Sequence, residues 1–204
     1  MAKSAAANRK ESGTVFIPNR FLTRSMSLVH AINSLTHTDH QVGVPKNLVA
    51  RWLSETRSPD RDVYGLAALR RASGYHHCLV GLDGRLWSVE CSATRQALVR
   101  PEAPFVHTNH FLTRLSAWEG ERRVTGTRAR YRCASANVRD SMSLEEVKRL
   151  AGDASEGRTK SIFNDRTIAR MIIDLPGMTA HVWLRREAAK GWLAYPLGFA
   201  AASL

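Results

Sequence analysis

A chain of 204 residues is long enough for one domain with a hydrophobic core of its own. Its three cysteines lack a CxxC motif, and no stretch approaches the roughly 18 apolar residues of a membrane span, so we expect a cytoplasmic protein without disulfides or a membrane partner. The 30 basic and 18 acidic residues give a net charge of +12, which attracts polyanions, but the arginines are scattered and no nucleic-acid-binding signature is present. Nucleic-acid binding is therefore only a distant alternative function for this chain.

The chain is expected to consist of a short tail and a single domain. Met1 to Glu11 is polar and too poor in apolar residues to offset the entropy of ordering. We therefore expect residues 1–20 to form a disordered or diverged tail and residues 21–204 to form the domain.

The first elements of the domain are a strand and two helices. Residues 28–35 have the composition of a strand. Pro45 fits the first position of a helix, and apolar residues at helical spacing extend the prediction over residues 45–56. A second set of apolar residues at helical spacing predicts a helix over residues 62–72.

The pattern then changes to a period of two, which is typical of strands. Residues 76–80 and 87–91 alternate in this way, and Asp83-Gly84 between them favours a tight hairpin turn. Residues 104–109 are a third strand candidate. The hairpin predicts antiparallel pairing in this part of the chain.

The last third of the chain predicts one helix and a second hairpin. Ser143 to Glu146 forms a capping box, which indicates the start of a helix. Residues 167–175 and 179–184 are rich in strand-forming residues and are joined at Pro176-Gly177. Strands in hairpins with helices clustered between them predict an α+β domain with antiparallel sheet.

Residues 106–111, Val-His-Thr-Asn-His-Phe, carry the strongest functional signal. Two imidazoles and an amide crowd one short segment that otherwise reads as the end of a buried strand. Buried polar groups are costly unless they are hydrogen-bonded, so such a concentration favours a functional site. Taken alone, Asn109 is also typical of a turn.

Seven segments within residues 32–197 resemble one family in their order. The chain resembles the acyl-coenzyme A:6-aminopenicillanic acid acyltransferase family, also called isopenicillin N acyltransferase-like, of the N-terminal-nucleophile hydrolases. The most specific segment is His107 to Phe111. The segments are Ile32-Asn33-Ser34-Leu35, Gly43-Val44-Pro45 with Arg51, Ser73 to His77, Ser88-Val89-Glu90, His107 to Phe111, Thr127 to Arg132, and Thr167-Ile168-Ala169 to Asp174.

The resemblance implies a four-layer αββα sandwich and acyl chemistry. In the family a cysteine that becomes N-terminal by self-cleavage attacks an amide or thioester carbonyl, and the acyl group passes to an amine or to water. The implied partner is a small-molecule acyl substrate, either an amide or an acyl-coenzyme A thioester. Neither a cofactor nor a metal is expected.

Two site residues are carried over from the family by position. Asn109 matches the active-site asparagine, whose amide can donate a hydrogen bond to the developing oxyanion. Arg130, which is followed by an aromatic residue as in the family, would orient the catalytic centre and anchor carboxylate groups. Arg128 lies one register away and is the competing match.

The expected cysteine nucleophile is missing from its family position. It should lie upstream of Ile32 to Leu35, but residues 1–31 contain no cysteine. We therefore expect a sandwich that is truncated or incomplete at its N-terminus, with an upstream chain or a second copy covering the exposed sheet edges. The expected function is acyl transfer or amide hydrolysis, and the alternative is a non-catalytic remnant or acyl-ligand-binding module.

Two other residues could supply the nucleophile. Cleavage at Gly13-Thr14 would make Thr14 N-terminal. Cys91 follows Glu90 and could approach His107 in a Cys/His arrangement, although its place on an apolar strand face favours an inert core cysteine.

Other polar residues have structural interpretations. His37 and His40 flank Asp39 and could bind a metal, but no fourth ligand of suitable spacing is evident. His76 and His77 should point to opposite faces of their strand as a core or rim pair. Glu90 is expected either to pair with an arginine or to act as a site acid.

Overall fold

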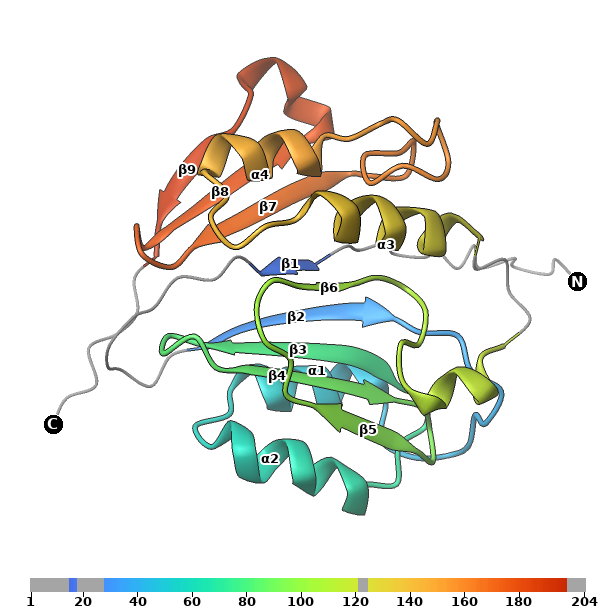
Figure 1. Ribbon diagram of the computed structural model, residues 1–204. Helices are drawn as coiled ribbons and strands as arrows, with labels where there is room; N and C mark the ends of the chain where they lie inside the picture. Colours follow the sequence, from blue (N-terminus) through green and yellow to red (C-terminus); the bar gives the residue numbers. More distant parts are fainter. Residues whose placement is uncertain (1–14, 18–27, 121–124, 198–204) are drawn as a thin grey trace, which may run out of the picture.

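The computed structural model describes residues 15–17, 28–120 and 125–197 as an α+β fold (Figure 1). All pairings between the described strands are antiparallel, which confirms the expected α+β class with antiparallel sheet. Strand β1 (Val15–Ile17) lies within the expected tail and pairs with a strand from the middle of the chain. The other residues of that tail lie outside the described ranges.

A four-stranded sheet in the order β2-β3-β4-β5 forms the largest layer. The predicted hairpin of β3 and β4 is confirmed, and Gly84 adopts a positive φ of 82° in its turn. Strand β5 was not predicted. The strands are β2 (Leu28–Ser34), β3 (Tyr75–Gly81), β4 (Leu86–Cys91) and β5 (Gln96–Val99).

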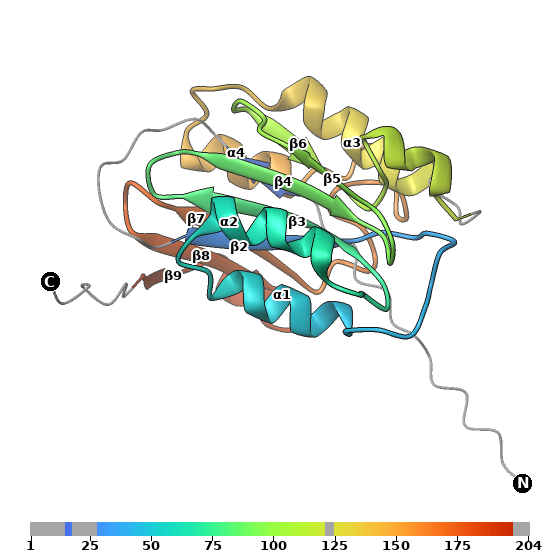
Figure 2. The ribbon, with the colours of Figure 1, turned by 90° about the horizontal axis from the view of Figure 1, so that it is seen from below.

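Helices α1 (Lys46–Ser54) and α2 (Pro59–Gly65) lie across one face of this sheet (Figure 2). Leu53 of α1 and Val63 of α2 are completely buried there. Burial of apolar side chains on this scale, worth about 1.5–3 kcal/mol for each large residue, holds the helices to the sheet. The strand residues in the same cluster, such as Leu79 and Val89, are also apolar.

The predicted helix over residues 62–72 is wrong in its bounds. The helix begins earlier because Pro59 occupies its first turn, and a short 3₁₀ helix (Leu66–Ala68) follows it. The chain then leaves the helix because Ala72 N–H donates to Val44 O at 2.9 Å. The buried Arg71 side chain also donates to Ser92 O and Arg95 O, at 3.2 and 3.1 Å. These tertiary hydrogen bonds override the local helical pattern.

The opposite face of the sheet packs against strand β6 (Phe105–His107), which pairs with β1. Phe105 joins a cluster with Cys78 and Val80 of β3. Val106, the next residue, packs instead with helices α3 (Thr125–Asn137) and α4 (Leu144–Ala151). Strand β6 therefore lies between the large sheet and these two helices.

A three-stranded sheet of β7 (Ala169–Asp174), β8 (Thr179–Leu184) and β9 (Leu193–Pro196) completes the described fold. The predicted hairpin of β7 and β8 and the capping box at the start of α4 are confirmed. Ile172 of β7 packs against the cluster formed by α3 and α4. Helix α3, strand β9 and the 3₁₀ helices Arg114–Trp118 and Arg185–Lys190 were not predicted.

Candidate functional site

Asn109 lies just after β6 and is held by contacts from two other elements. Its backbone N–H donates to Thr127 Oγ1 at 2.7 Å, at the start of α3. Its side-chain Nδ2 donates to Ser34 O at 3.2 Å, at the end of β2. The amide is therefore fixed between β2 and α3, and it is not turned outward into solvent.

Arg130 contacts the same amide from α3. Its Nη2 donates to Asn109 Oδ1 at 3.1 Å, so the structure brings the two predicted site residues together. Only 6% of Arg130 is exposed. Burial and the nearby positive charge of Arg166 lower the pKa of the Arg130 guanidinium.

The Arg130 guanidinium keeps unused donor capacity. Its Nε is buried and has no hydrogen-bond partner among the described residues, and no described carboxylate forms an ion pair with it. A buried charge that lacks a counterion among the described residues is costly, and the free Nε can donate to a carboxylate or carbonyl oxygen. Arg128, the competing match, is more exposed and pairs with Glu119 at 3.0 Å.

Thr127 was not singled out from the sequence, although it organises this corner of the molecule. Its Oγ1 accepts from Asn109 N and lies 3.2 Å from His110 Nδ1. Thr108 Oγ1 donates to Thr127 O at 3.1 Å. Thr127 is the first residue of the segment Thr127 to Arg132, which resembles the family. The sequence alone does not show which side chains of that segment point toward Asn109.

Buried polar residues form a network close to Asn109 in the chain, on the face of the large sheet that packs against β6. Glu90 Oε1 accepts from His107 Nε2 at 2.9 Å and from Leu112 N at 2.6 Å. Its Oε2 accepts from Thr113 N and Oγ1 at 3.1 and 2.5 Å. Burial raises the pKa of Glu90, but the hydrogen bonds outweigh that effect and the net pKa lies below its usual value. Among the described residues the ion-pair partner of Glu90 is His107 and not the expected arginine.

The histidine pair of β3 divides between the two faces of its strand, as predicted. His76 Nδ1 lies 3.1 Å from Asn33 Oδ1, and the His76 ring stacks on His107 with a centroid distance of 3.4 Å. On the other face, His77 Nδ1 lies 3.1 Å from His30 Nε2. Burial lowers the pKa of His30 to about 4 and that of His77 to about 3, so both rings are neutral at physiological pH.

None of the three cysteines has the environment of a thiolate nucleophile. Cys78 and Cys91 are completely buried, and burial raises the pKa of each to about 12. Cys91 faces the α1 and α2 core, whereas Glu90 and His107 lie on the opposite face of the sheet, so the Cys/His arrangement is wrong. Cys133 of α3 donates to Asp153, which follows α4, and burial together with that carboxylate raises the pKa of Cys133.

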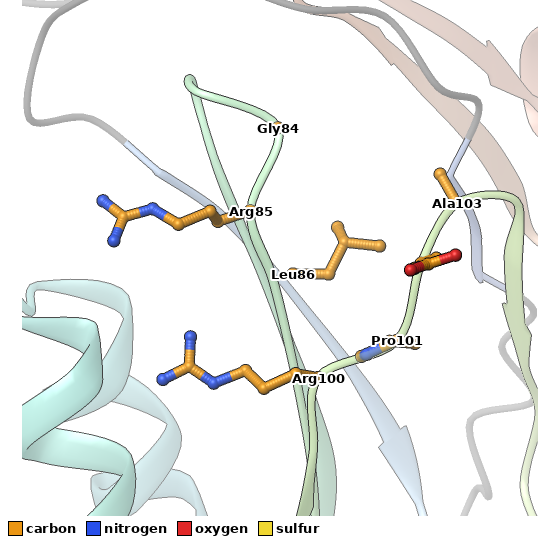
Figure 3. A pocket seen from close by; sticks show the side chains of 7 residues that line it. Gly84, Arg85, Leu86, Arg100, Pro101 and Ala103 are labelled. Atoms are coloured by element: carbon orange, nitrogen blue, oxygen red, sulfur yellow. The ribbon is translucent and has the colours of Figure 1, made fainter.

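A cavity of about 470 Å³ lies elsewhere, beside the β3–β4 turn. Figure 3 shows Arg85 and Arg100 extending away from Ala103 on its opposite wall. Both guanidinium groups already contact Asp60 and lie over the Trp87 ring. The cavity is therefore not part of the Asn109 site.

Within the described ranges, no group of three His, Cys, Asp or Glu side chains could hold a metal ion.

The fold and the site define an α+β domain in which a partly buried amide contacts a buried guanidinium. A protein-family model described as acyl-coenzyme A:6-aminopenicillanic acid acyl-transferase matches residues 26–188. The chain belongs to this family, since the match covers most of its 204 residues. No curated protein matches it. Among the residues that the structure describes, no helix is long and apolar enough to cross a membrane.

Proposed function

We propose that the chain binds a small acyl amide or acyl thioester at Asn109 and Arg130, and that it acts in acyl transfer or amide hydrolysis. The observation that carries this proposal is the buried Arg130 guanidinium, which contacts Asn109 and whose Nε has no partner in the part of the chain that the structure describes. A carboxylate or carbonyl oxygen of a ligand would complete its hydrogen bonding. Family membership supports the acyl chemistry.

The reaction proposed is the one that the family description names. The amine nitrogen of an acceptor such as 6-aminopenicillanic acid forms a bond to the acyl carbon of an acyl-coenzyme A. The carbon–sulfur bond breaks, and coenzyme A leaves as a thiol with the proton given up by the amine. Water in place of the amine gives hydrolysis of the thioester. With an amide substrate, the water oxygen bonds to the acyl carbon, the carbon–nitrogen bond breaks, and the amine leaves with a proton from the water. The Asn109 amide and the Arg130 guanidinium would orient the carbonyl and stabilise negative charge on its oxygen.

The proposal includes the four-layer αββα arrangement of N-terminal-nucleophile hydrolases. Helices α1 and α2 on one face of the large sheet are consistent with the outer layer on that side. Packing of Phe105 toward the sheet and of Val106 toward α3 and α4 is consistent with two inner strand layers and a second helical layer.

The nucleophile of such an enzyme would be a residue other than the three cysteines. The candidates are Thr14, which lies outside the described residues, and a residue from a partner chain or a second copy. The environment of the cysteines favours a second candidate function, an acyl-ligand-binding module without turnover. Product formation distinguishes these two functions, and loss of product in Thr14→Ala would identify that nucleophile.

The test measures binding and turnover with hexanoyl-coenzyme A and 6-aminopenicillanic acid. Arg130→Ala should raise the dissociation constant of hexanoyl-coenzyme A about 10- to 100-fold, as expected for a charged hydrogen bond worth about 1.5–3 kcal/mol. Arg132→Ala is the matched control, because Arg132 lies on the same helix, is exposed, and carries the same charge. Equal losses in the two variants would indicate a general charge effect and would contradict the proposal.

Chromatographic detection of the acylated product then assigns the class. Product that disappears in Asn109→Ala would support an acyltransferase, and released hexanoic acid would support a hydrolase. Binding without either product would support the binding module. Absence of saturable binding by the native chain would contradict all three.

A further inference from the structure

A serine, a histidine and an aspartate outside the Asn109 site lie within short contact distance of one another, with a hydrogen bond between the first two. His37 Nε2 lies 3.0 Å from Ser73 Oγ, and His37 Nδ1 lies 2.7 Å from Asp39 Oδ1. His37 is 3% exposed, whereas Ser73 is only half-buried. The three side chains thus have the connectivity of a nucleophile, a base and a group that orients the base.

A backbone contact defines which nitrogen of His37 carries the proton. Gly74 N–H donates to His37 Nε2 at 3.1 Å. Because a backbone N–H can only donate, Nε2 must hold the lone pair, and the ring proton must lie on Nδ1, the nitrogen that is 2.7 Å from Asp39 Oδ1. This is the tautomer in which Nε2 can accept the hydroxyl proton of Ser73.

Asp39 is firmly held in the position that this arrangement requires. Its Oδ2 accepts from Ser92 Oγ at 2.7 Å and from Thr94 N and Oγ1 at 3.0 and 2.5 Å. Arg95 adds an ion pair at 3.2 Å. Burial raises the pKa of Asp39, but these hydrogen bonds outweigh that effect and hold it well below its usual value. The carboxylate is therefore ionised and oriented.

The loops that carry Ser73 and His37 are also fixed. A Cβ placed on Gly74 would lie 1.9 Å from Cys91 O, so the glycine allows its loop to lie against the end of β4. On the other side, His37 forms a β-bridge with Glu119, and Gly120 N donates to Thr36 O at 3.0 Å. The distance between base and nucleophile is thus set by tertiary structure, which favours a defined reactivity.

We propose that Ser73 is a nucleophilic centre, separate from the Asn109 site, that accepts an acyl group from small activated esters, with His37 as its base and Asp39 as the positioning residue. Ser73 Oγ forms a bond to the ester carbonyl carbon as its proton passes to His37 Nε2. The ester carbon–oxygen bond then breaks, and the alcohol leaves with that proton. Water can hydrolyse the acyl-serine by the reverse proton path. This proposal goes beyond the function assigned to Asn109 and Arg130.

Gly74 sets a limit on the expected rate. Its N–H shares the Nε2 lone pair with the Ser73 hydroxyl, which makes His37 a weaker base than one whose only donor is the serine. We therefore expect slow labelling that is nevertheless selective for Ser73 over other serines.

The test uses a fluorophosphonate probe on the full chain, followed by intact mass and peptide mapping. Ser73 Oγ bonds to phosphorus, the phosphorus–fluorine bond breaks, and fluoride and a proton are released. One adduct at Ser73 is expected. It should be absent in Ser73→Ala and should form at least tenfold more slowly in His37→Gln and Asp39→Asn. Ser54→Ala, which removes an exposed hydroxyl, should be labelled like the parent chain.

Two further measurements keep the result interpretable. Asn109→Ala and Arg130→Ala should retain the adduct, so failure of the acyl-coenzyme A binding proposal would not affect this one. His37→Gln removes the base, but it also changes the acceptor of the Gly74 backbone N–H. Ser73→Cys avoids this second effect because it keeps His37. At about pH 6.5 its thiol should react with iodoacetamide at least tenfold faster than that of Ser54→Cys. Equal rates for the two thiols, or no adduct at Ser73 in the parent chain, would overturn the proposal.

Discussion

Glu90 contributes to stability through hydrogen bonds that a neutral side chain could satisfy only in part. Its carboxylate accepts from His107 and from the backbone and hydroxyl groups at Leu112 and Thr113, although Glu90 is only 1% exposed. The donors come from β6 and from the segment after it, so one side chain fixes the position of the loop that contains Asn109. The role of Glu90 is therefore to hold the Asn109 loop in position.

Replacement of Glu90 by glutamine should destabilise the fold by about 3 kcal/mol, because the amide NH₂ would face donors that are buried with it. Urea unfolding of the purified variant measures this change. Glu145→Gln is the control: that carboxylate is exposed and pairs with Lys148 on the surface, so its removal should change stability by less than about 0.5 kcal/mol. A Glu90→Gln variant within about 1 kcal/mol of the parent would contradict this role.

The neutral histidines make stability depend on pH. The pKa of His30 is lowered to about 4 and that of His77 to about 3, from an ordinary value of 6.5. Below pH 6.5 the unfolded chain therefore binds protons that the folded chain excludes, so stability is fully present above this pH and falls as the pH decreases toward 4. The urea midpoint should decrease between about pH 7.5 and about pH 5, and His30→Gln should reduce the slope. A flat profile would contradict this account.

At the scale of elements, sequence patterns located the structure where local chemistry dominates. The two hairpins and the capped helix α4 follow from turn residues and a reciprocal side-chain cap. Helix α3 was not predicted because its sequence lacks large apolar residues at helical spacing. The residues that it buries include Thr127, Arg130 and small alanines. Strands β5 and β9 are each only four residues long, too short for a clear alternation.

The Ser73–Gly74 loop depends on the absence of a side chain at Gly74. A Cβ there would lie 1.9 Å from Cys91 O and 2.8 Å from Ser92 N. These backbone atoms at the end of β4 cannot move away easily. Gly74→Ala should therefore destabilise the fold by about 3 kcal/mol. Gly65→Ala is the control, since its Cβ would meet only the Trp52 side chain at 3.7 Å; it should be neutral or stabilising by about 0.5 kcal/mol. Equal thermal stability of the two variants would show that the close approach at Gly74 has no energetic consequence.

At the scale of the whole molecule, the candidate site joins parts of the chain that the sequence keeps far apart. The resemblance to a family predicted Asn109 and Arg130, and the fold places them in contact between β2, β6 and α3. The sequence could not predict the anchoring of Asn109 by the Ser34 carbonyl, because that contact depends on how the layers pack. The hydrogen bond between His37 and Ser73 was missed for the same reason, although both residues stood in recognisable segments.

The measurement that tests the central claim most directly is a double-mutant cycle on hexanoyl-coenzyme A binding with Asn109→Ala, Arg130→Ala and the double variant. It is made at about 0.15 M salt, so that the net charge of +12 contributes little to binding of an anionic ligand. If the two side chains act on the ligand as one unit, the double variant should lose clearly less binding energy than the sum of the single variants, with a coupling of about 0.5–3 kcal/mol. Unchanged affinity in the single variants, or losses that simply add, would contradict the claim that Asn109 and Arg130 form one acyl-binding site.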